Sequence, residues 1–159
     1  MTQYSAYIGR DYPSEWPLQL DTVQMSFEDH TVHYALAGDV ADKEWAALLP
    51  SGGVVVHLGP ANRPFTVSMF HQLRCLDTVR RALAVYKENG TEASAPARHC
   101  LNYLRQMTLC RASTRLENVR DSSRYRHKVT VAETTYTCRD WNAVVDAAEE
   151  NWSEYEASL

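Results

Sequence analysis

Two helix-forming segments within residues 66–110 constrain the fold of this chain more than any other part of the sequence. The first carries apolar side chains at the three- and four-residue spacing of a helix face, which predicts burial of that face: Phe70, Leu73, Leu76, Ala82, Leu83 and Tyr86. Asn89 and Gly90 mark its end, because both residue types tolerate left-handed backbone. The second segment starts near Ser94 and accommodates Pro96 in its first turn. The short polar turn between them predicts two antiparallel helices in contact.

Shorter elements are expected before this helix pair. Alternating apolar residues in 22–27 and 31–36 predict a β-hairpin, with residues 28–30 as its turn. A short helix through residues 45–49 is expected next. A continuous apolar run at residues 54–58 then predicts a buried strand.

After the helix pair, residues 111–128 are polar and aperiodic, which indicates a surface loop, and residues 129–138 alternate as a strand does. Asp140 is a typical helix N-cap, and apolar residues at helical spacing follow it: Trp141, Val144, Val145, Ala148 and Trp152. The predicted class is α+β, mostly helical, with a small antiparallel β component packed on the helix pair and the C-terminal helix. Residues 1–21, rich in Tyr, Pro and Ser, are expected to form an extended arm on a single domain of residues 22–159.

Charge and hydropathy narrow the classes of partner. The formal net charge of −4 argues against nucleic acid, because backbone phosphates are met by basic surfaces. Arg74, Arg80 and Arg81 are predicted to lie on a solvated helix face. No apolar run approaches the ~20 residues that a bilayer span requires, and residues 1–10 show no signal peptide. A soluble chain is expected, in the cytoplasm or, if an anchor has been removed, in the endoplasmic reticulum lumen or secretory pathway.

Each helix of the pair carries a short motif that ends in cysteine: HQLRC at residues 71–75 and PARHC at residues 96–100. The pair resembles a degenerate copy of the twin H-x-x-H-C motifs of the UstYa-like family of fungal natural-product tailoring proteins. Segments at residues 42–48, 99–106 and 138–141 resemble other signatures of that family, so the similarity runs from about residue 10 to residue 152.

The resemblance implies a copper site built from four histidines, and oxidative cyclisation, hydroxylation or halogenation as the chemistry. In this chain Arg74 and Pro96 occupy two of those histidine positions, and neither side chain offers a lone pair to a metal. The other histidines stand at no ligand spacing on an expected element: His30, His33, His57 and His127. Two imidazoles, His71 and His99, are too few for a typical protein metal site, so the sequence predicts no metal and no other cofactor.

The predicted catalytic residues are therefore His71, Arg74, Arg98 and His99, with Tyr103 nearby. A histidine near its free pKa suits general acid or base work, and an arginine can hold a carbonyl or carboxylate oxygen. This equipment favours a redox-neutral, metal-independent cyclisation or isomerisation, of the pericyclase or cyclase type, of a polyketide- or peptide-derived intermediate.

Two other hypotheses stay open. One is a copper-dependent oxidase of the family's usual type, with His71 and His99 as retained ligands. The other is a non-catalytic partner of an active family member. The expected partners are a small-molecule biosynthetic intermediate and either a second copy of the chain or another family member.

Four cysteines allow three pairings: Cys75, Cys100, Cys110 and Cys138. The resemblance places all four at characteristic positions, which implies disulfides between Cys75 and Cys100 and between Cys110 and Cys138. Four buried thiols that pack as small hydrophobic groups are the alternative.

Overall fold

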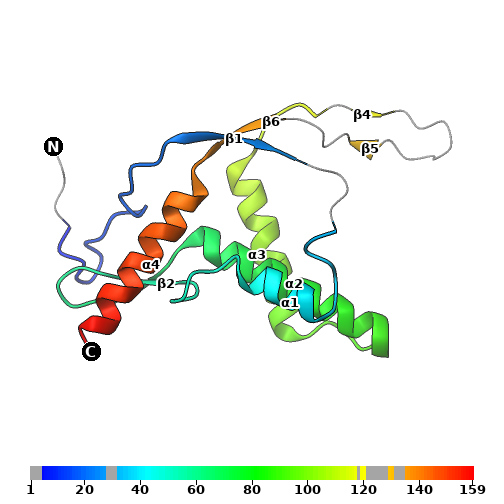
Figure 1. The fold of residues 1–159 in the computed structure, drawn as a ribbon, viewed down its shortest axis with the longest axis horizontal. Coiled ribbons are helices and arrows are strands. Elements are labelled where there is room, and N and C mark those ends of the chain that lie inside the picture. The colour runs from blue at the N-terminus through cyan, green and yellow to red at the C-terminus, as the bar shows by residue number, and fades with distance from the viewer. Residues whose placement is uncertain (1–4, 28–31, 118, 121–128, 131–134) are drawn as a thin grey trace.

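The computed structural model describes residues 5–27, 32–117, 119–120, 129–130 and 135–159. Within these ranges the helices are α1 (Asp39–Ala46), α2 (Ser68–Asn89), α3 (Ala95–Arg111) and α4 (Trp141–Ala157). The strands are β1 (Thr22–Ser26), β2 (Val55–Leu58), β3 (Arg63–Thr66), β4 (Val119–Arg120), β5 (Val129–Thr130) and β6 (Thr135–Arg139). They form two-stranded antiparallel ladders, β1 with β6, β2 with β3 and β4 with β5 (Figure 1). The predicted class, mostly helical α+β, is confirmed.

The core lies where α4 crosses β2 and the start of α2. Its buried centre consists of Val56, Phe70, Val144 and Ala148, so β2, α2 and α4 each contribute at least one side chain. Asn151 connects α4 to β2, because its side chain accepts a hydrogen bond from His57 N and donates one to His57 O, each at 2.7 Å. Burial of these apolar side chains supplies the main driving force for folding.

Local signals set the ends of the long helices where the sequence predicted them. Gly90 ends α2 in the left-handed conformation, with φ of 64°. The side chain of Ser94 caps α3 by accepting from Ala97 N, with Pro96 in the first turn. Asp140 caps α4, where its Oδ1 accepts from the backbone N–H groups of the first turn.

The second half of α2 extends beyond α3, because residues 90–94 lead back toward the middle of α2 (Figure 1). Leu83 at 52% and Tyr86 at 60%, both in this half of α2, are exposed, and so is Leu76 at 43%, nearer the start of the helix; all three belong to the stripe predicted to face the core. The prediction of burial was therefore wrong for these three and right for Phe70, which is fully buried.

The predicted hairpin of residues 22–27 and 31–36 was also wrong. The partner of β1 is β6, with Thr22 opposite Arg139 and Ser26 opposite Thr135. Residues 32–36 form bends in which Tyr34 N donates to a Glu44 carboxylate oxygen, and residues 28–31 lie outside the described part. Alternation of apolar residues identifies a strand but not its partner.

The described part of the N-terminal segment lies against the β2–β3 ladder. The rings of Tyr7 and Tyr12 contact Phe65, and Arg63 Nη1 donates to the carbonyl oxygens of Tyr7 and Gly9. These contacts place the aromatic side chains of residues 5–20 beside the core and create one wall of the cavity described below.

Candidate active site

The structure brings together the two histidines that the motifs retain. The ring centroids of His71 on α2 and His99 on α3 are 6.3 Å apart, and their planes differ by 24°. The Tyr103 ring, one helical turn after His99, stacks on His71 with centroids 4.2 Å apart. The helices run antiparallel here, because Cys100 lies beside Cys75 whereas Tyr103 lies beside Ser68, earlier in α2. The sequence predicted these three residues but could not show that they meet.

Two polar side chains connect this cluster to a cavity. Ser68 Oγ lies 3.5 Å from the Tyr103 hydroxyl and accepts a hydrogen bond of 2.9 Å from Gln72 Nε2. Ser68 and Gln72 also line the cavity, so they form the boundary between it and the histidine pair. Neither residue was among the predicted site residues, because a serine and a glutamine near the start of a helix carry no distinctive chemical signal.

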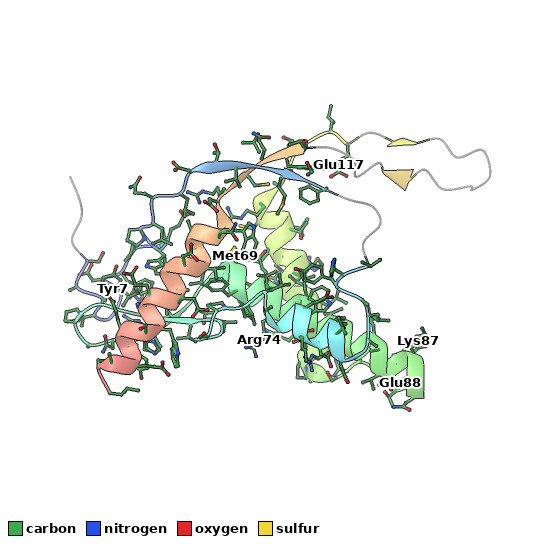
Figure 2. The ribbon with its side chains drawn as sticks, viewed as in Figure 1. Tyr7, Met69, Arg74, Lys87, Glu88 and Glu117 are labelled. Atoms are coloured by element: carbon green, nitrogen blue, oxygen red, sulfur yellow. The ribbon has the colours of Figure 1, made fainter. Side chains whose placement is uncertain are left out.

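The cavity has a volume of about 660 Å³, which is the size of a small-molecule site. The N-terminal segment, β3, α2, α3, β6 and α4 all contribute to its wall. Figure 2 labels two lining residues, Tyr7 on the N-terminal segment and Met69 at the start of α2. Because these segments are distant in the sequence, no local pattern could have predicted the cavity.

The two predicted arginines do not join the cluster. Nη2 of Arg74 lies 3.5 Å from the point where a β-carbon on Gly53 would sit, and this exposed side chain projects away from the ribbon (Figure 2). Arg98 Nη1 donates to the Ala93 carbonyl oxygen at 2.6 Å, which holds the guanidinium on the turn before α3. The structure thus divides the predicted set into a histidine–tyrosine cluster, Arg98 held on the turn before α3, and Arg74 directed toward Gly53.

The other described histidines lie outside the cluster. His33 Nδ1 contacts the Glu44 carboxylate at 2.5 Å, and the His57 ring stacks on Tyr155 at 3.6 Å. Within the described ranges no group of three or more His, Cys, Asp or Glu side chains is arranged to hold a metal ion. His30 and His127 fall in residues that the structure does not describe.

All four cysteines are free thiols in the structure. Cys75 and Cys100 are buried and in contact between α2 and α3, whereas Cys110 is exposed and Cys138 half-buried. The pairings of Cys75 with Cys100 and of Cys110 with Cys138 stay predictions.

Because of the buried Cys75 thiol, the free energy of unfolding of the reduced protein is expected to fall as the pH rises through the alkaline range. Burial, and then the hydrogen bond with Cys100, raises the pKa of Cys75 to about 12 from its ordinary value of 9.0. The unfolded chain therefore loses this proton first, and the stabilisation that is complete below pH 9 declines as pH rises toward 12. Urea unfolding in reductant between pH 8 and about pH 11 is expected to show a steeper loss of stability for the wild type than for C75A, and equal slopes would contradict the burial of this thiol.

The sequence model of the family described as "Mycotoxin biosynthesis protein UstYa" matches residues 10–154, nearly the whole chain. The chain belongs to the UstYa family. No solved structure matches, and no helix in the described part is long and apolar enough to cross a membrane.

Two curated UstYa relatives are similar over part of their length. "UstYa family oxidase phomYe" of Diaporthe leptostromiformis is 30% identical over 101 residues, which cover 58% of this chain and 35% of the relative. "Oxidase ustYa" of Aspergillus flavus is 32% identical over 87 residues, which cover 54% of this chain and 40% of the relative. The alignments thus span less than half of the length of either relative.

These names contradict the main functional prediction. Both relatives are called oxidases, so the prediction of a redox-neutral cyclisation or isomerisation was wrong, and the alternative of an oxidase is favoured. That prediction relied on Arg74 as a partner of the histidines, whereas the structure directs Arg74 toward Gly53 and pairs His71 with His99 and Tyr103.

Proposed function

We propose that this UstYa-family chain is an oxidase that acts on a small-molecule intermediate of mycotoxin or related natural-product biosynthesis, with copper held by His71 and His99. The observation that carries the proposal is the approach of these two rings, 6.3 Å apart, from two motifs on different helices. The names of both relatives support the reaction class.

The distance between the His71 and His99 rings is compatible with a copper ion held by two imidazoles. A metal–imidazole bond is about 2 Å long, so two rings that share one ion have centroids no more than roughly 6.5 Å apart. The observed separation of 6.3 Å lies close to the upper end of this limit. Imidazole suits several transition metals, but Cu²⁺ binds most tightly among the divalent ions, and zinc carries no redox chemistry. Arg74 and Pro96 stand at the two motif positions that lack a histidine, so this chain would hold the ion with two imidazoles.

The residues around the histidines position them and receive the substrate. The Tyr103 ring stacks on His71 and restrains its orientation, while Ser68 contacts the Tyr103 hydroxyl. The walls of the adjoining cavity, mostly apolar, can exclude water from a substrate held beside this cluster. Copper, when bound, supplies one-electron chemistry with dioxygen as the electron acceptor.

Copper binding by the purified, metal-stripped chain tests the proposal. Titration with copper(II), followed by electron paramagnetic resonance, is expected to reach saturation at about one equivalent with hyperfine splitting from two nitrogens. Saturation by zinc alone, or a copper signal without nitrogen splitting, would contradict the proposal.

A further inference from the structure

We infer that the 660 Å³ cavity binds an aromatic molecule that carries a carboxylate group. The inference deepens the proposed function, and rests on it only in naming this molecule class as the substrate.

The cavity is rich in aromatic side chains, which define the body of the ligand. Five rings line it: Tyr7, Tyr12, Trp16, Phe65 and Trp141. The other lining side chains are divided between apolar and polar or charged ones, so the wall combines much ring surface with a few polar groups. Aromatic walls of this kind favour flat, apolar ligands through stacking and burial of apolar area.

Two arginines define the charged group of the ligand. Arg111, the last residue of α3, and Arg139, the last residue of β6, line the same cavity from different elements. Neither has an ion-pair or side-chain hydrogen-bond partner within the described ranges, whereas six other arginines there do: Arg63, Arg80, Arg81, Arg98, Arg105 and Arg115. A guanidinium presents planar donors that match a carboxylate.

Neither acidic side chain of the cavity lining, Glu15 or Asp140, forms an ion pair with Arg111 or Arg139 within the described ranges. Asp140 Oδ1 already accepts from the N–H groups of Asn142 and Ala143 as the cap of α4. Glu15 is exposed and forms no ion pair with either arginine. The two guanidinium groups thus remain available to a ligand.

The position of the cavity connects this ligand to the proposed chemistry. Ser68 and Gln72 belong both to its wall and to the hydrogen bonds around Tyr103, which stacks on His71. A ligand with its carboxylate at Arg111 and Arg139 and its ring against the aromatic wall would lie beside the histidine pair. The arginines are positioning residues in this arrangement.

Calorimetric titration of the metal-free protein with 2-naphthoate and with 2-naphthamide tests the inference. The two probes share the same ring system and differ only in carrying a charged carboxylate or a neutral amide. The wild type is expected to bind naphthoate about tenfold more tightly than naphthamide. The R111A/R139A variant is expected to lose this preference while its affinity for naphthamide is unchanged. R105A, which removes an exposed arginine of α3 outside the cavity, is the matched control and is expected to retain the preference.

Two outcomes would overturn the inference: equal affinities of the wild type for both probes, or a preference for naphthoate that survives in R111A/R139A. Both arginines are exposed, and unchanged naphthamide binding by R111A/R139A serves as the direct check that the cavity of the variant is intact. An H71A/H99A variant separates the two proposals, because it is expected to lose copper binding and keep the naphthoate preference. The naphthoate preference of the cavity can therefore be judged even if the wild type fails to bind copper.

Discussion

Replacing either His71 or His99 with alanine is expected to weaken copper binding more than about a hundredfold. Changes to groups that merely support a metal ligand cost about 10- to 100-fold in affinity, and loss of a ligand itself exceeds this range. The effect is large here because the described residues offer no third His, Cys, Asp or Glu side chain in a group that could hold the ion. Competition with a chromogenic copper chelator measures the affinity of each variant.

The double variant H71A/H99A is expected to bind copper little more weakly than either single variant, because one imidazole alone cannot chelate. H33Q is the matched control, since it removes an exposed histidine that contacts Glu44 on α1, away from the cluster. Circular dichroism checks that the variants fold. Wild-type copper affinity in both single variants would place the metal site elsewhere in the protein.

Local chemistry in the sequence explains what could be predicted of the fold. The ends of α2, α3 and α4 followed from Gly90, Ser94 and Asp140, because a cap acts within a few residues of its own position. The sequence did not identify β6 as the partner of β1. The two strands lie more than a hundred residues apart, and any strand with alternating apolar residues satisfies the same pattern.

The candidate site shows the same division. The motifs identified His71 and His99, but the segment of residues 90–94 decides which turns of α2 and α3 meet, and its composition does not encode that alignment. The residue three positions after His71, Arg74, was expected beside it on the helix surface. A long side chain can follow either of two directions from such a position, and this one extends toward Gly53.

Arg80 was also placed wrongly by the sequence, which predicted a solvated helix face. Only 5% of its side chain is exposed, and it connects α2 to α1 and to the segment before it. Its Nη2 lies 2.6 Å from Asp42 Oδ1, its Nε lies 2.7 Å from Asp77 Oδ1, and its Nη1 donates to the Leu36 carbonyl oxygen. A buried arginine with paired carboxylates is uncommon enough that composition alone favours exposure.

Replacing Arg80 with alanine is expected to lower the free energy of unfolding by about 3 kcal/mol, because removal of one partner from a buried ionic cluster leaves the others uncompensated. Urea unfolding at pH 7 measures the change. The hydrogen bond from Arg80 is the main cause that lowers the pKa of Asp42. A lowered pKa stabilises the fold above the unfolded pKa near 4, so the difference between wild type and R80A is expected to narrow as pH falls below that value.

Arg81 provides a matched control, because it approaches the same two carboxylates from a position that is 54% exposed. R81A is expected to cost less than about 1 kcal/mol, as exposed ion pairs do. R80M fills most of the volume of the arginine without its donors and is expected to remain destabilised. Wild-type stability in R80M would mean that Arg80 acts by packing against the Trp45 ring, 5.8 Å from its guanidinium carbon, and that the carboxylates of α1 and α2 need no cation between them.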